Sequence, residues 1–454
     1  MALAAELRTL NRHQWAAVSA SFLGWTLDAF DFFLMVFMFS AIAKEFHTDI
    51  PAVAVASTLT LAARPFGALV FGMLADRFGR RWVLVIDILL FSGLEFACAF
   101  APSLTVLMIL RALFGFAMGG EWGVGASLAM ESIPAKARGF ISGLLQEGYA
   151  TGYLLAAVVF YFLFDRIGWR GMFMVGVAPA LLAAFITLGV KESPAFEAHK
   201  ITAPKQSLWV MFAIGVGAIA VAMAPALVGA VVGELDKNAM LKMVYFVDAP
   251  IALAGLFLFR KHWRMAIYII LLMTAFNFLS HGSQDIYPTF LKEQHHLDTQ
   301  TVGLLTIIGN VGAILGGLIF GAWSERLGRR WAIVIAVVLC VAMIPLWAFS
   351  HTVAMLALGA FLMQVMVQGA WGIIPVHLNE LSPPEARGAF PGYAYQVGNL
   401  LASGNLVWQA QIAKAQGNNY GLALALVAGA VCVVIAVLTL FGPERRGVAF
   451  AGGH

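Results

Sequence analysis

Residues 71–82 read FGMLADRFGRRW, and residues 320–331 read FGAWSERLGRRW, the same pattern 249 positions later. The same offset superposes ESIPAKARG, residues 131–139, on ELSPPEARG, residues 380–388, without a gap. Two separate motifs that share one offset indicate an internal duplication. The chain is therefore predicted to contain two equivalent halves.

The composition places both halves in a membrane. Of the 454 residues, 61% are apolar and only 11% are charged, whereas soluble domains carry about 25% charged residues. The apolar segments are long and lack the alternation of a membrane β-barrel. We therefore predict an all-α polytopic membrane protein. The sequence does not favour nucleic-acid binding, and the three isolated cysteines suggest neither a metal site nor a disulfide framework.

Fourteen segments are long enough to cross a bilayer. They begin near residues 15, 52, 82, 103, 140, 170, 208, 239, 265, 301, 331, 352, 389 and 420. The predicted division is an N-terminal six-helix bundle at 1–191, a central loop with an extra helical hairpin at 192–259, and a C-terminal six-helix bundle at 260–454. The hairpin either spans the membrane, enters and leaves it on the same side, or lies at the membrane surface.

The distribution of lysine and arginine predicts the orientation. With a cytoplasmic N-terminus, nineteen basic residues fall on the cytoplasmic side and seven on the other, while Arg64 and Arg111 stay within the membrane. This bias predicts that both termini are cytoplasmic. A parallel duplication of this kind is typical of secondary transporters.

A polar stripe interrupts the apolar run 265–291, where residues 277–289 read NFLSHGSQDIYPT. Asn277, Ser280, His281 and Gln284 follow helical spacing on one face, with Asp285 at its edge. Ionisable groups in hydrocarbon usually face a bundle interior or a water-filled cavity. The stripe therefore predicts a translocation site. The alternative is a packing stripe that hydrogen-bonds neighbouring helices.

The first half carries a matching polar site. The offset maps Asp28 onto Asn277 and Asp31 onto Ser280, and the helical rise places them near the midplane. Arg64 lies at a similar depth and needs an anion, because a guanidinium stays charged at accessible pH. Asp28 and Asp31 are candidate proton carriers and Arg64 a candidate substrate ligand. The alternative is that both acids pair with Arg64 as a structural triad.

Further candidates accompany these sites. His281 and Asp285 are helical neighbours that can share a proton, and imidazole titrates near neutral pH. Gln396 and Asn399 are uncharged amides, one turn apart, that can hold a carboxylate. Tyr149 and Tyr153 can narrow the pocket. Glu121 is either a second proton site or a salt-bridge partner of Arg111 or Arg138.

Charged residues of the repeated motifs are the predicted gate. At helix ends, such charges can pair in one conformation and separate in the other. The predicted gating residues are Asp76, Arg77, Arg80, Glu131, Arg138, Glu325, Arg326, Arg329, Glu380 and Arg387.

The motifs resemble a known family. Residues 72–81 and their copy at 321–330 look like the loop motif of the major facilitator superfamily, and 111–123, RALFGFAMGGEWG, is similar to the fourth-helix signature of its proton symporters. The stretch 277–289 fits the N-x-x-S/T-H-x-S/T-Q-D-x-x-x-T pattern of lactate and pyruvate symporters in the sialate/carboxylate group. The central insert resembles the extra spans of sialic acid permeases.

The resemblance implies a major facilitator fold and alternating access. It assigns Arg64 to substrate recognition and places substrate contacts at Gln396 and Asn399. The expected function is proton-coupled uptake of a short monocarboxylate, lactate or pyruvate, across the cell membrane by a monomer, driven by the proton gradient without a cofactor. The alternatives are a sialic acid or aromatic-acid symporter and, more distantly, an intramembrane enzyme or a sensor.

Overall fold

The structure is a computed structural model that describes residues 2–48, 50–199, 215–217 and 255–450. In these ranges every regular element is a helix. The first part contains α1 (Ala2–Thr9), α2 (Arg12–Glu45), α3 (Ile50–Phe78), α4 (Arg80–Cys98), α5 (Leu104–Met118), α6 (Glu121–Ser132), η1 (Ala135–Ala137), α7 (Arg138–Gln146), α8 (Gly148–Val175), α9 (Pro179–Gly189) and α10 (Pro194–His199).

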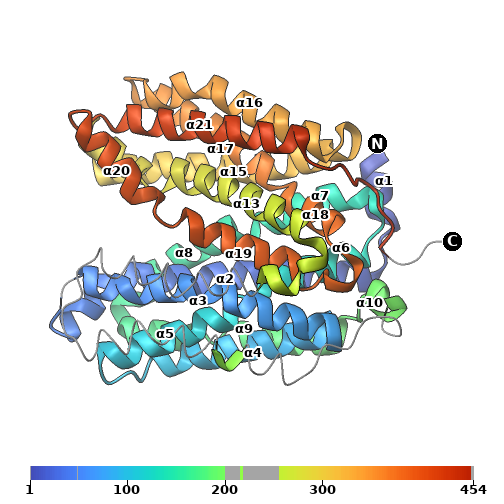
Figure 1. The fold of residues 1–454 in the computed structure, drawn as a ribbon. Coiled ribbons are helices and arrows are strands. Elements are labelled where there is room, and N and C mark those ends of the chain that lie inside the picture. Colours follow the sequence, from blue (N-terminus) through green and yellow to red (C-terminus); the bar gives the residue numbers. More distant parts are fainter. Residues whose placement is uncertain (1, 49, 200–214, 218–254, 451–454) are drawn as a thin grey trace.

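The second part contains η2 (Arg260–His262), α13 (Trp263–Gln284), α14 (Tyr287–Glu293), α15 (Thr299–Leu327), α16 (Arg329–Ala348), α17 (Val353–Trp371), α18 (Ile374–Leu381), η3 (Pro384–Ala386), α19 (Phe390–Ala402), α20 (Asn405–Ala415) and α21 (Tyr420–Phe441). Figure 1 shows the blue-to-green helices gathered on one side and the yellow-to-red helices on the other.

Each group of helices packs on itself. In the N-terminal bundle, α2–α9, α2 packs against α8 and α3 against α5. In the C-terminal bundle, α13–α21, α13 packs against α19 and α15 against α17. The two bundles meet where α7 contacts α15, α3 contacts α19 and α6 contacts α18. Residues on these pairs therefore form the interface along which the bundles can move.

Gly79 and Gly328, the equivalent glycines of the two loop motifs, permit a backbone turn between consecutive helices. Gly79 joins α3 to α4 with φ 104°, and Gly328 joins α15 to α16 with φ 91°. Side chains with a β-carbon rarely adopt this left-handed region. The glycine of each copy therefore permits the sharp turn that carries the following arginine pair into the next helix.

Nine helical stretches among the described residues are long and apolar enough to cross a membrane. The fourteen predicted spans are not confirmed. Most of the predicted insert, 208–259, lies outside the described residues, so the division at 192 and 259 stays a prediction. α4 is absent from the nine, and it carries Arg80, Arg81, Asp87 and Glu95 in its 19 residues.

Candidate transport site and gate

An ion pair between α2 and α3 is the centre of the N-terminal site. Arg64 Nη2 donates to Asp28 Oδ1 and lies 3.6 Å from Met118 Sδ. The residues are only 4% and 1% exposed. Asp28 Oδ2 and Arg64 Nε are buried without a hydrogen-bond partner. The pair therefore uses only part of the hydrogen-bonding capacity of each side chain, and burial makes unused capacity costly.

Glycines hold the helix that carries Arg64. A β-carbon at Gly115 or Gly119 of α5 and its C-cap would overlap the carbonyl oxygen of Thr60 or Arg64. The absence of a side chain lets α5 approach the backbone of α3 closely. In this structure the glycines of the predicted fourth-helix signature thus fix the depth and position of Arg64.

Asp31 and Glu121 are buried, and their side chains have no hydrogen-bond or ion-pair partner among the residues that the structure describes. Both carboxylate oxygens of each residue lack a hydrogen bond, and each residue is 0% exposed. Of the alternative triad, only one pair is present: Arg64 pairs with Asp28, whereas Asp31 forms no hydrogen bond with a described residue. Glu121 instead packs against Gly24 of α2, where a β-carbon would overlap its Oε1.

The predicted salt bridge of Glu121 is also wrong. Arg111 pairs with Glu95 of α4, and both residues are 0% exposed. Arg138 donates to backbone oxygens of Met130 and Val448. The sequence reading missed Glu95 and the neighbouring Asp87, which is fully buried with both carboxylate oxygens unpartnered. Their positions in the sequence could have identified them, because acidic residues within an apolar run of a membrane protein are functional candidates.

The C-terminal site joins α13 to α19 and α17. His281 Nδ1 lies 3.2 Å from Asp285 Oδ2, and its Nε2 lies 3.2 Å from Asn399 Oδ1. Gln284 donates to Gln364 Oε1 at 2.9 Å. Gln364 of α17 was missed, since one amide in an apolar run resembles helix packing. The structure thus brings five polar side chains of three helices together.

This second site differs from the first in its exposure. The His281 and Asp285 side chains are 35% and 40% exposed, whereas the charged groups of the N-terminal site are buried. Asn277 donates to Met273 O of its own helix, and Gln396 Oε1 is buried without a partner. A solute can therefore reach the His281–Asp285 pair more readily than Asn277 or Gln396.

Aromatic rings connect the two sites. The Phe33 ring lies 4.7 Å from Tyr153 and 5.4 Å from Tyr149, and Tyr149 lies 5.7 Å from Trp25. The Trp25 centroid is 6.3 Å from that of Tyr395 in α19. The predicted pocket tyrosines therefore belong to a ring network that crosses from one bundle to the other.

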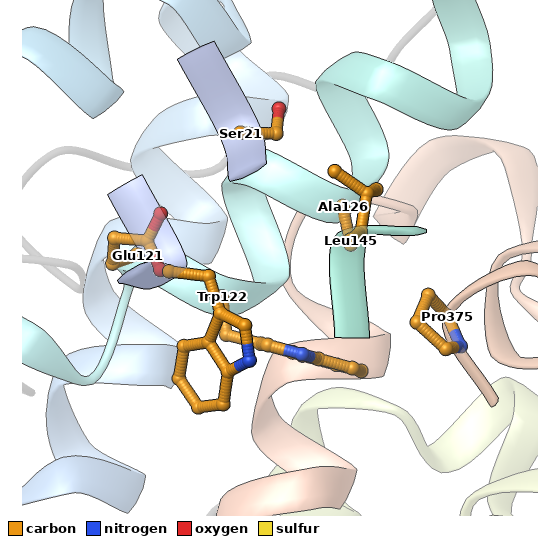
Figure 2. A pocket seen from close by; sticks show the side chains of 7 residues that line it. Ser21, Glu121, Trp122, Ala126, Leu145 and Pro375 are labelled. Carbon is orange, nitrogen blue, oxygen red and sulfur yellow. The ribbon is translucent and has the colours of Figure 1, made fainter. Parts of the chain in front are cut away.

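A small pocket lies beside this crossing. Figure 2 shows Ser21, Glu121, Trp122, Ala126 and Leu145 of the N-terminal bundle around it, with Pro375 of α18 on the opposite side. The pocket therefore spans the bundle interface. It also brings the unpartnered carboxyl group of Glu121 to that interface.

Two equivalent hydrogen bonds close the interface at one end, here called the gate end. Asp76 Oδ1 accepts from the Gly388 backbone N–H at 2.7 Å, and Glu325 Oε1 accepts from the Gly139 N–H at 2.5 Å. The 249-residue offset relates the members of both pairs. Each bundle thus contributes one carboxylate and one backbone donor.

Ion pairs extend this network. Arg80 contacts Asp76 at 3.0 Å and Glu131 at 3.1 Å, and Arg387 approaches Glu131 at 3.8 Å. In the other copy, Arg329 contacts Glu325 at 2.8 Å and Glu380 at 3.0 Å. Of the remaining predicted gate residues, Arg77 lies 5.3 Å from the Phe78 ring and Arg326 is exposed.

The segment after α21 crosses the gate end. Arg138 Nη1 donates to Val448 O at 2.7 Å, and Gly447 N donates to Glu380 Oε1 at 3.0 Å. The Phe450 ring lies 3.6 Å from the Arg138 guanidinium carbon and 4.1 Å from that of Arg387. Phe450 is only 3% exposed. This apolar ring is thus held between arginines of opposite bundles, a contact that the sequence reading missed.

Comparison with known families supports this architecture. The profile described as Major Facilitator Superfamily matches residues 21–212, and the profile described as Sugar (and other) transporter matches residues 250–445. The chain belongs to the major facilitator superfamily. As a member, it is a multi-pass membrane transporter and not an enzyme.

Individual relatives cover nearly the whole chain. A carboxylic acid transporter protein homolog of Saccharomyces cerevisiae is 27% identical, over 97% of this chain and 70% of its own length. The sialic acid transporter NanX of Escherichia coli is 23% identical, over 97% of this chain and 96% of its own length. The solved proton:xylose symporter XylE has a TM-score of 0.69 at 18% identity, over 96% and 97% of the two chains.

Proposed function

We propose that this transporter takes up a short monocarboxylate, lactate or pyruvate, together with a proton. The observation that carries the proposal is Arg64, a buried guanidinium whose contact with Asp28 uses one carboxylate oxygen and leaves Arg64 Nε free. A planar guanidinium binds a carboxylate through two parallel hydrogen bonds. Protonation of Asp28 weakens its hold on Arg64, so a substrate carboxylate can take its place.

Charge conservation explains why proton and anion move together. A substrate anion without a proton adds an unpaired charge to a buried site, and a proton without the anion leaves Arg64 uncompensated. The loaded and the empty carrier are therefore the states that cross most easily. Asp28, Asp31, Glu121 and the His281–Asp285 pair are the proposed proton carriers, and Asn399, Gln284 and Gln396 the proposed polar contacts of the substrate.

The relatives support a carboxylate and leave a second candidate substrate. One relative is named for carboxylic acids and another for sialic acid. The His281-Gly-Ser-Gln284-Asp285 stretch favours lactate or pyruvate through the resemblance already described. Sialic acid, or an aromatic acid facing the Tyr149 and Trp25 rings, is the alternative proton symport substrate.

The proposed setting is the cell membrane with both termini in the cytoplasm. The first helix and the final segment lie at the gate end, since Lys136 reaches Glu6 at 3.6 Å and Arg138 binds Val448; Figure 1 shows α1 and the end of the red chain on the same side. We propose that a monomer suffices and that the proton gradient alone drives uptake.

Purified protein in liposomes tests this function. Radiolabelled lactate is added outside while unlabelled pyruvate, sialic acid or benzoate competes. The proposal predicts saturable lactate uptake that pyruvate inhibits more strongly than the two larger acids. Stronger inhibition by sialic acid or benzoate would assign the site to that acid, and a lack of saturable carboxylate uptake would contradict the proposal.

A further inference from the structure

Glu147, at the junction of α7 and α8, is buried against the opposite bundle. It is 4% exposed, and its Oε1 has no hydrogen-bond partner in the described ranges. A β-carbon at Gly317 of α15 would overlap this oxygen. The carboxyl group of the N-terminal bundle therefore rests directly on the backbone of the C-terminal bundle.

Glycines bring the two bundles together next to Glu147. A β-carbon at Gly143 of α7 would overlap Gly317 O, and one at Gly139 would overlap Gly321 O. Gly139 also makes the gate hydrogen bond to Glu325. Glu147 thus occupies the inner end of a close helix contact whose other end is the gate, about 12 Å away by helical rise.

Within the described part of the chain, no charged group pairs with Glu147. The elements that pack against α7 and α8 carry two sets of ionisable residues. The acids are Asp28, Asp31, Glu45, Asp87, Glu95, Glu121, Glu131, Glu325 and Glu380, and the basic residues are Arg12, His13, Lys44, Arg80, Arg81, Lys136, Arg326 and His377. Among the described residues, none of these forms an ion pair or hydrogen bond with the Glu147 side chain. An ionised carboxylate buried without compensation is strongly unfavourable, so the group takes up a proton instead.

From this geometry we propose that Glu147 is a proton-binding site whose access to water depends on the separation of the two bundles. With the gate end closed, as here, Glu147 holds a proton. Opening the gate end separates α7 from α15 and lets water reach the carboxyl group, which releases the proton there. The inference rests on the proposed proton-coupled function and adds a carrier that the sequence reading left out of the coupling residues.

The direction of the pH dependence follows from this assignment. The closed state binds one proton more at Glu147 than the open state, so raising the pH favours opening of the gate end. One linked proton changes such an equilibrium by up to about tenfold per pH unit. Glu147→Gln retains a neutral group of similar shape and removes this dependence.

The experiment measures the gate directly. Spin labels are placed on cysteines that replace Lys136 of η1 and Leu327 of α15, which are exposed residues of opposite bundles on elements that touch. The native cysteines Cys98, Cys340 and Cys432 are buried. Distances between the labels are recorded in liposomes between about pH 6 and about pH 8.

In the otherwise unchanged protein, the ratio of open to closed gate should rise at least about tenfold over this range. Glu147→Gln should change by less than about twofold and remain closed. Asp165→Asn, an exposed acid on the same helix α8, should behave like the parent. A Glu147→Gln response equal to that of the parent, or a parent gate that does not respond to pH, would overturn the assignment.

A transport readout separates this inference from the proposed function. Glu147→Gln should retain counterflow exchange of lactate, which needs no proton release, and lose accumulation driven by a proton gradient. If the parent transports lactate without protons while Glu147 still controls the gate, the proposed function fails and the site stands. If Glu147→Gln accumulates lactate like the parent, Glu147 is not a coupling site and the proposed function stands.

Discussion

The carboxylate of Asp76 and the backbone N–H of Gly388, which belong to opposite bundles, are joined by a hydrogen bond of 2.7 Å. Glu325 and Gly139 form the equivalent contact with the roles of the bundles exchanged. The duplication therefore produces two symmetry-related closures of one gate. This exchange explains the repeated motifs, because the acid in the first motif of each copy binds the glycine that ends the second motif of the other copy.

Removing one closure should open the gate. A hydrogen bond to a charged group contributes about 1.5–3 kcal/mol, so Asp76→Ala should raise the open-to-closed ratio by roughly ten- to a hundredfold. Glu325→Ala should act in the same direction. Label distances between positions 136 and 327 report the change. A closed population equal to that of the parent in both Asp76→Ala and Glu325→Ala would contradict this role.

The final segment should stabilise the same closed state. Phe450 lies against Arg138 and Arg387 of opposite bundles, and a cation–π contact contributes about 0.5–2 kcal/mol. Phe450→Ala should therefore raise the open population severalfold. Val448→Ala is the matched control, because the Val448 backbone oxygen binds Arg138 while the residue itself is 37% exposed. Equal distributions of label distances in Phe450→Ala and Val448→Ala would argue against a closing role for Phe450.

Close packing between the bundles should be required for closure. A β-carbon at Gly123 of α6 would lie 2.7 Å from Gly392 Cα of α19, so Gly123→Val should hold the bundles apart and slow transport at least about tenfold. Gly93→Val serves as the control, since nothing lies within 4 Å of a β-carbon there. Normal turnover in Gly123→Val would show that this contact is not needed.

The buried guanidinium should be essential for binding. Arg64→Ala should abolish saturable lactate uptake, because it removes the cation and leaves Asp28 without its partner. Arg64→Lys should retain weak uptake with an affinity lower by roughly tenfold or more, since an ammonium lacks the planar fork. Uptake measured over a range of lactate concentrations distinguishes Arg64→Ala from Arg64→Lys. An unchanged affinity for lactate in Arg64→Ala would show that Arg64 does not belong to the binding site.

The duplication, the helical fold and the pairing of His281 with Asp285 could be predicted because they depend on local spacing and on one shared offset. The partner of Arg111 could not, and neither could the absence of an ion pair at Glu121 among the described residues. Arg111 lies on α5 and Glu95 on α4, so their pairing is set by the rotation of two packed helices. Likewise, Phe450 meets Arg138 across 312 positions, and no periodicity in the sequence relates them.

Glu147 illustrates the same limit. Its neighbours in sequence, Gln146 and Gly148, mark a break between two helices, yet its burial depends on Gly317 of the other bundle. Contacts across the interface exist only in one arrangement of the bundles. Helical spacing and the internal repeat therefore identify polar residues such as Asp76 and Glu325, but they do not show which group of the opposite bundle each one contacts.

The most direct test of proton-coupled carboxylate uptake is the internal pH of liposomes that contain the purified protein and a pH-sensitive dye. An inward lactate gradient is imposed at equal internal and external pH, with empty liposomes as the control for passive entry of lactic acid. We expect internal acidification that exceeds the control, saturates with lactate and disappears in Arg64→Ala. Protein-dependent lactate entry without a change in internal pH would contradict it.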